Sequence, residues 1–147
     1  MIAGSSLAPA SVIYRFNGTT ASSLNQLFQY TAPDYITTQG YVGTASLDSC
    51  TRCTTNPFAI YFWPSVPAGP LGTFDSITFY DINGSSYVYY FAEGAFSTDG
   101  LHATSPLLPF NTGTLQVNNT ATPEPPAWLF AGPAIMVVWR RYRHRIR

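Results

Sequence analysis

Hydrophobic and polar residues alternate in short runs over most of the first 120 positions of the chain. Successive side chains of a β-strand point to opposite faces, so a period of two predicts strands. Pro64 is expected to end one of these runs. Only in 22–30, with Leu24, Leu27 and Phe28 at helical spacing, does a short helix compete. The predicted strands are 12–16, 39–47, 58–63, 77–82, 85–92, 94–97, 101–105 and 114–118.

The clearest turn signal lies between two of these runs, at Asn83-Gly84. A two-residue type I′ turn needs positive φ at both central residues, and Asn-Gly is the pair that adopts it most readily. We therefore expect an antiparallel hairpin within 73–92.

About eight short strands within roughly 110 residues, with turns every 8–12 residues, are typical of an antiparallel sandwich. A domain of this length can build its own hydrophobic core. The sequence thus predicts an all-β protein with one antiparallel β-sandwich, jelly-roll-like, over residues 11–117.

The last 25 residues follow a different order, which begins with Pro123, Glu124 and Pro125. An apolar stretch over 127–139 comes next and predicts a short C-terminal transmembrane helix. Its length is about 20 Å, against a hydrocarbon core of about 30 Å, so the anchor would be marginal. Arginines that follow such a stretch stay on the cytoplasmic side, which makes 140–147 a basic cytoplasmic end. This cluster consists of Arg140, Arg141, Arg143, Arg145 and Arg147.

This ordered tail resembles the PEP-CTERM sorting domain of Gram-negative and related bacteria. The resemblance covers 123–147, with 118–122 as a polar spacer, and Pro133 and the short span depart from the usual pattern. It implies that an exosortase, an integral-membrane cysteine protease, recognises the Pro-Glu-Pro tripeptide. The protein would then be exported, held transiently in the inner membrane and passed to the cell surface or outside. Genomes with this system usually also encode extracellular polysaccharide synthesis, so polysaccharide is an expected partner.

The N-terminus agrees with export in part. Ala8-Pro9-Ala10 has the small-x-small form of a signal-peptidase site, but no basic and apolar regions precede it. We interpret 1–10 as the remnant of a signal peptide whose true start lies upstream. A flexible cytosolic N-terminus is the alternative.

Charge narrows the choice of partners. The chain has no lysine, and residues 11–122 hold two basic residues against six acidic ones, a formal net charge of −4. Phosphate binding depends on clustered Lys and Arg, so we expect no nucleic acid on this part. The basic tail could serve as a nucleic-acid arm, but its place after an apolar stretch favours a membrane.

Two cysteines, Cys50 and Cys53, form a CxxC motif. A structural zinc site needs four ligands, and only His102 and His144 remain to complete one, the second of them inside the arginine tail. A thioredoxin-like role needs a βαβ pattern, which is missing around the motif. We therefore favour a local disulfide in an oxidising compartment, with a redox pair or a metal site as alternatives.

No catalytic motif is present: the sequence lacks GxSxG, HExxH and a phosphate-binding glycine loop. His102 follows Asp99 by three positions, and Asp48 and Asp99 could contribute oxygen ligands to Ca²⁺. The acids that could form a glycosidase pair are Asp75, Asp81 and Glu93. Solvated polar surface explains all of them equally well. We predict a non-enzymatic surface or matrix protein without a cofactor; a carbohydrate-binding module and a small secreted hydrolase are the alternatives.

The aromatic content of 16 % suggests one binding surface. Tyr87 and Tyr89 share one face of a predicted strand. Exposed to solvent, they would form a platform on which sugar rings stack. The alternative is that both rings pack in the core or at its rim.

Overall fold

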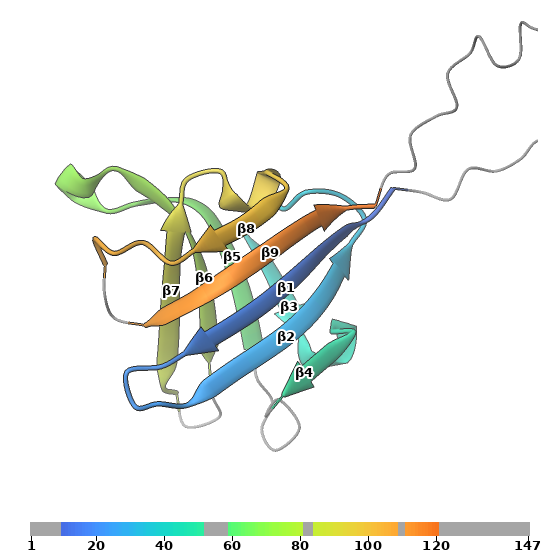
Figure 1. The fold of residues 1–147 in the computed structure, drawn as a ribbon, viewed down its shortest axis with the longest axis horizontal. Helices are drawn as coiled ribbons and strands as arrows, with labels where there is room; N and C mark the ends of the chain where they lie inside the picture. The colour runs from blue at the N-terminus through green and yellow to red at the C-terminus, as the bar shows by residue number, and fades with distance from the viewer. Residues whose placement is uncertain (1–9, 52–58, 81–83, 109–110, 121–147) are drawn as a thin grey trace, which may run out of the picture.

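In the computed structural model, residues 10–51, 59–80, 84–108 and 111–120 are described, and they form an all-β domain (Figure 1). The described residues contain nine strands and three short 3₁₀ turns. The turns are η1 (Thr44–Ser46), η2 (Gly69–Leu71) and η3 (Ala95–Ser97).

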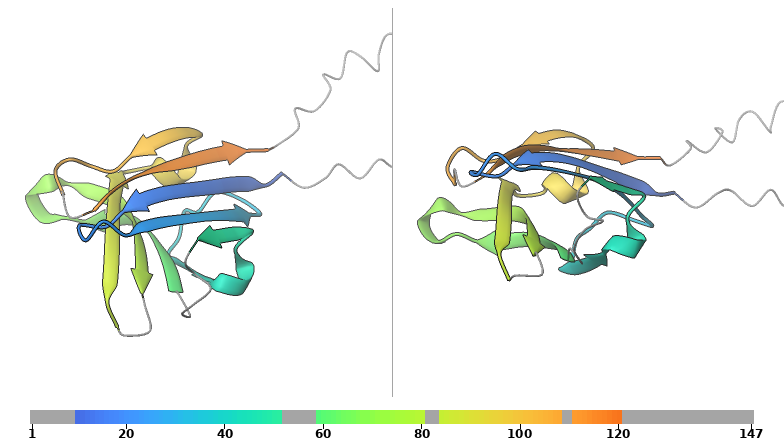
Figure 2. Two further views of the ribbon diagram at one scale, coloured as in Figure 1. Left: turned by 60° about the horizontal axis from the view of Figure 1, so that its bottom comes forward. Right: turned by 90° about the horizontal axis from the view of Figure 1, so that it is seen from below.

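The strands form two antiparallel sheets that lie as two layers (Figure 2). The five-stranded sheet has the order β4 (Ser49–Thr51), β2 (Asn25–Ala32), β1 (Val12–Thr19), β9 (Thr112–Asn119) and β8 (Gly100–Ala103). The four-stranded sheet has the order β3 (Gly40–Gly43), β5 (Ala59–Pro67), β6 (Thr73–Tyr80) and β7 (Ser86–Ala92). Sequential neighbours such as β1–β2, β5–β6–β7 and β8–β9 pair directly. This order is closer to a set of hairpins than to the two Greek keys of a jelly roll.

The inner faces of the two sheets share one aromatic core. Phe16 of β1 lies at its centre, with ring centroids 5.4 Å from Phe28, 5.3 Å from Phe79 and 4.7 Å from Tyr89. Aromatic rings prefer such tilted and edge-to-face contacts, which add to the free energy of burial. The high aromatic content of the chain is therefore used in part to fill the space between the sheets.

Two tyrosines bring polar groups into this core, and both are satisfied. The Tyr14 hydroxyl donates to the Phe96 carbonyl at 2.7 Å and accepts from the Ile36 N–H at 2.8 Å. The Tyr89 hydroxyl donates to the Gln26 Oε1 at 2.8 Å. Burial raises the pKa of Tyr14 to about 12 and raises the pKa of Tyr89 as well. Both phenols therefore stay neutral hydrogen-bond donors well above neutral pH.

The predicted hairpin is confirmed in its two strands, since β6 and β7 pair antiparallel with Thr78 opposite Val88. Gly84 has the positive φ, 79°, that the turn requires; Asn83 lies outside the described residues. The strands predicted at 12–16, 101–105 and 114–118 correspond to β1, β8 and β9.

Three elements differ from the prediction. The segment 22–30 forms no helix: β2 pairs with β1 along its whole length, because Gln26 and Phe28 alternate toward the core. The run 94–97 is the 3₁₀ turn η3 rather than a strand, and it starts after Gly94 at a φ of 84°. The run 39–47 is a strand only over β3 and then becomes η1.

Pro64 does not end the third predicted strand, because β5 continues to Pro67 through a bulge. The register with β6 shifts between Trp63 and Val66. Ser65, inside the bulge, has a φ of 54°, in the left-handed region. A bulge leaves a residue out of the ladder, which is where a strand tolerates proline.

The two ends of the described domain meet. The Thr120 N–H donates to the Ser11 carbonyl at 2.7 Å, next to the pairing of Val12 with Asn119. β9 thus includes the first two residues of the expected spacer 118–122. Within the described part of the chain, no helix has the length and apolar character needed to cross a membrane. The expected transmembrane segment 127–139 and the rest of the tail 123–147 lie outside that part.

Candidate functional site

The proposed platform of Tyr87 and Tyr89 is not on the surface. Tyr89 is 0 % exposed and its ring packs against Phe16 and Phe79, while Tyr87 is half-buried against the core. Both side chains point to the inner face because β7 aligns with β6 in a register that places Tyr89 beside Ile77. The prediction of a stacking site at these two residues is therefore wrong.

A different aromatic surface covers the outside of the same sheet, and we call it the aromatic face. It is formed by Tyr41 of β3, Tyr61 and Trp63 of β5, and Tyr80 of β6. Tyr41 is 61 % exposed and Tyr80 is 37 % exposed, whereas Tyr61 and Trp63 are half-buried. Exposed aromatic side chains that gather in this way mark an interaction surface.

Tyr61 lies at the centre of the aromatic face. Its ring centroid is 5.2 Å from Tyr41, 6.0 Å from Trp63 and 5.4 Å from Tyr80. Tyr41 stands directly opposite Tyr61 in the pairing of β3 with β5, and Trp63 follows two residues later on the same side of the strand. The rings therefore support one another and form a pre-ordered surface.

The outer side of this sheet is uncharged in its described part. Between the large side chains of β5 and β7, β6 contributes Ser76 and Thr78, which are 3 % and 5 % exposed. Tyr90 continues the aromatic surface on β7. Its ring centroid lies 6.4 Å from that of Phe74 on β6. Ser76 and Thr78 are thus buried, and a surface of aromatic rings and tyrosine hydroxyl groups without charge suits a neutral polar ligand better than an ionic one.

The sequence contains a weak signal for this surface. In β5, Tyr61 and Trp63 alternate with Ile60 and Phe62, so both faces of the strand are apolar. Alternation alone cannot tell which set is buried when both sets are hydrophobic. The Tyr61 hydroxyl and the Trp63 indole N–H favour the outer side for these two residues, because such groups remain hydrated there.

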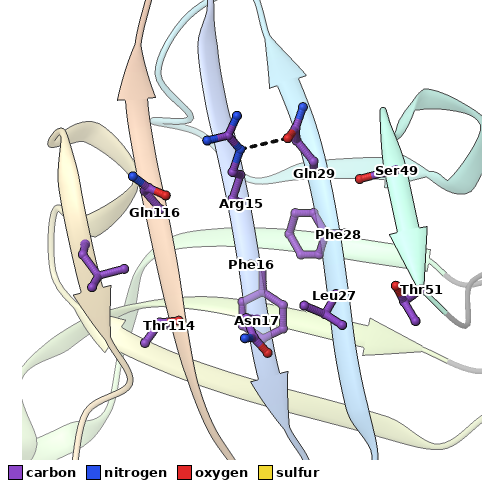
Figure 3. A pocket seen from close by; sticks show the side chains of 11 residues that line it. Arg15, Phe16, Asn17, Leu27, Phe28, Gln29, Ser49, Thr51, Thr114 and Gln116 are labelled. Carbon is purple, nitrogen blue, oxygen red and sulfur yellow. Dashed lines mark hydrogen bonds between the residues drawn. The ribbon is translucent and has the colours of Figure 1, made fainter.

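The opposite sheet carries a polar hollow of ≈ 400 Å³ on its outer face (Figure 3). All five strands contribute to its lining, with Arg15 at its centre. The polar side chains that line it are Arg15, Asn17, Gln29, Ser49, Thr51, Thr114 and Gln116. The Arg15 Nε donates to the Gln29 Oε1 at 2.9 Å. No motif in the sequence pointed to this hollow, because its residues come together only through the pairing of distant strands.

Two of the acids that could have formed a glycosidase pair have structural roles. Asp75 is 2 % exposed, and its carboxylate accepts from the Ser65 N–H and the Phe96 N–H, both at 3.0 Å. Glu93 accepts from the hydroxyl groups of Ser65 and Thr73. Together these bonds hold the β5 bulge and the turn η3. Asp81 lies outside the described residues.

The other polar candidates belong to separate hydrogen-bond networks. The His102 Nε2 lies 2.8 Å from the Thr98 carbonyl. Asp99 accepts from the Asn119 N–H at 2.7 Å and from the Tyr35 hydroxyl at 3.1 Å.

Asp48, the other candidate for Ca²⁺, accepts from Thr31 and Gln29 of β2. Among the described residues, no three His, Cys, Asp or Glu side chains are grouped to hold a metal ion. The structure therefore does not bring Asp48 and Asp99 into one metal site within its described part.

Cys50 lies on β4 beside β2, half-buried against the core, and is disulfide-bonded. Cys53 lies outside the described residues, so the Cys50–Cys53 pairing stays a prediction. The sorting motif Pro123, Glu124 and Pro125 and the cluster from Arg140 to Arg147 also lie outside them.

Comparison with known proteins finds no matching family model, no matching curated protein and no matching solved structure.

Proposed function

We propose that this chain is an exported, non-enzymatic β-sandwich protein that associates with extracellular polysaccharide at the cell surface or in the matrix. The observation that carries the binding part of this proposal is the aromatic face. The flat side of a sugar ring presents C–H groups, which pack against the electron-rich face of an aromatic ring. Tyrosine hydroxyls at the same surface can exchange hydrogen bonds with sugar hydroxyls.

The sorting part of the proposal rests on the order of the tail. An exosortase would recognise Pro123-Glu124-Pro125 while 127–139 is held in the inner membrane and 140–147 stays on the cytoplasmic side. The described domain ends at the pairing of Ser11 with Thr120, so a tether attached there leaves the outer faces of both sheets accessible. A role as a carbohydrate-binding module uses the same aromatic face and differs only in the biological context.

Intact mass of the protein recovered from its native host tests the sorting. We expect a species that starts near Ser11, ends near Pro123–Pro125 and is lighter by two hydrogen masses before reduction. The N-terminal end of that species would support export, its C-terminal end would support processing of the tail, and the mass difference would support the Cys50–Cys53 disulfide. A full-length, reduced chain in the cytosolic fraction would contradict the proposal.

Removal of two exposed rings tests the binding. The double variant Tyr41→Ala and Tyr80→Ala is expected to bind the host's neutral polysaccharide at least about fivefold more weakly, since each ring contact contributes about 0.5–1.5 kcal/mol. Affinity electrophoresis measures this change. Leu107→Ala is the matched control, because Leu107 is 60 % exposed and lies between β8 and β9, outside the strands that carry the aromatic face. Unchanged retention in the double variant, with the fold intact by circular dichroism, would remove the aromatic face as the binding surface.

A further inference from the structure

The polar hollow on the five-stranded sheet is built from a straight row of side chains across all five strands. Strand pairing places Ser49 opposite Gln29, Gln29 opposite Arg15, Arg15 opposite Gln116, and Gln116 opposite Leu101. Neighbouring strands lie about 4.8 Å apart, so the row spans about 19 Å. A row of this length suits an extended ligand that crosses the strands.

A second row lies beside the first, two residues along each strand. It contains Asn17 on β1, with Leu27 on β2 and Thr114 on β9 opposite it. The hollow between and around these rows measures ≈ 400 Å³, within the usual range for small-molecule sites of about 300–1,000 Å³. Its lining combines amide and hydroxyl groups, which can donate and accept hydrogen bonds at once, with apolar surface that includes the exposed Leu27 and Leu101.

Arg15 gives the hollow its charge. The lining contains this arginine and no carboxylate. The guanidinium uses Nε to donate to Gln29, and its terminal nitrogens extend over the sheet (Figure 3). Two terminal N–H groups side by side match the two oxygens of a carboxylate. The nearest acid of this network, Asp48, is already bound by Gln29 and Thr31.

We propose that this hollow is a second binding site, and that it takes a glycan segment with a single carboxylate-bearing sugar seated at Arg15. The amide and hydroxyl rows would bind the hydroxyl groups of the neighbouring sugars. A densely charged polyuronide fits less well, because the net charge of −4 over residues 11–122 repels a polyanion. A site for a sparsely acidic glycan on one sheet and the aromatic face on the other would let one domain hold two chains together.

A pair of matched ligands tests this site without reference to the aromatic face. One is a β-linked glucose tetrasaccharide in which one unit is glucuronate, and the other is the all-glucose tetrasaccharide. Calorimetry at about 0.15 M salt, where surface charges are screened beyond about 8 Å, is the measurement. We expect the wild-type protein to bind the acidic tetrasaccharide at least about fivefold more tightly. Arg15→Gln should remove this preference by weakening the acidic ligand about tenfold, the loss typical of one charge-assisted contact.

Two further variants make the outcome specific. Arg15→Lys keeps the charge but not the paired donors, so it should retain part of the preference. The double variant Tyr41→Ala and Tyr80→Ala should retain the full preference for the acidic tetrasaccharide. Its result therefore distinguishes a failure of this site from a failure of the proposed function at the aromatic face. Equal binding of the two ligands by the wild type, no binding of either, or a preference that survives Arg15→Gln would each overturn the proposal. A urea unfolding curve for each variant shows that the exposed Arg15 was replaced without loss of the fold.

Discussion

Replacement of Phe16 by alanine is expected to lower the free energy of unfolding by about 3–5 kcal/mol, the largest stability effect of any single change considered for this domain. Phe16 is 2 % exposed and is in ring contact with Phe28, Phe79, Tyr89 and Phe91. Two of these rings belong to β7, one to β6 and one to β2. The alanine variant would therefore open a cavity between the two sheets, at the place where the Phe16 ring contacts side chains of both.

The local backbone gives the site little room to repair this cavity. A Cβ built on Gly18 would lie 2.3 Å from Cζ of Phe16 and 2.8 Å from the Tyr89 ring. The Phe16 ring therefore lies directly over Gly18, which has no side chain that could move into the gap. A well-packed site of this kind collapses only in part, which places the cost toward the upper end of the range.

Urea unfolding followed by circular dichroism measures the loss. Phe16→Leu keeps most of the volume and should lose less than half as much. Ile13→Ala is the matched control on the same strand, because Ile13 is half-buried on the outer side of β1. A loss below about 1 kcal/mol for Phe16→Ala would show that the two sheets do not depend on this contact.

The parts of the fold that could be predicted from the sequence are those fixed by local pattern. The alternation at Val12 and the Asn83-Gly84 turn signal each depend on a few neighbouring residues, and the structure has β1 and the β6–β7 pair at these places. The alternation around Phe28 competed with helical spacing. The segment forms a strand because it pairs with β1. A pattern read over a few neighbouring residues does not include the partner strand, so it could not predict this pairing.

The candidate sites could be predicted less well, for a physical reason. Tyr87 and Tyr89 were correctly placed on one side of a strand, but which side is buried depends on the register with β6 and on the position of the second sheet. On β5 the outer residues Tyr61 and Trp63 are large and aromatic like the inner Phe62, so only one hydroxyl and one indole N–H marked the exposed side. The row centred on Arg15 draws its side chains from strands up to about a hundred residues apart, and only the sheet order reveals it.

Replacement of Asp75 by alanine is the second change with a large expected effect, a loss of about 2–4 kcal/mol in the free energy of unfolding. The carboxylate accepts two backbone N–H groups, from Ser65 and from Phe96, and the second belongs to a fully buried residue. Without an acceptor, each donor bears the cost of its desolvation, about 1–3 kcal/mol per group. Asp75→Asn keeps one carbonyl oxygen and turns an N–H₂ group toward the other donor, so we expect an intermediate loss.

Thermal or urea unfolding measures these losses, with Glu93→Gln as the matched control. Glu93 binds the same bulge through the Ser65 hydroxyl but is exposed, so its replacement should cost less than about 1 kcal/mol. Because Trp63 is the last residue in register before the bulge, the loss of Asp75 should also disturb that end of the aromatic face. Asp75→Asn is therefore expected to weaken polysaccharide binding as well as stability, whereas Glu93→Gln leaves the affinity unchanged. Full stability of Asp75→Ala would mean that other acceptors satisfy the two N–H groups, and the bulge would then owe its shape to Pro64 and the strand register alone.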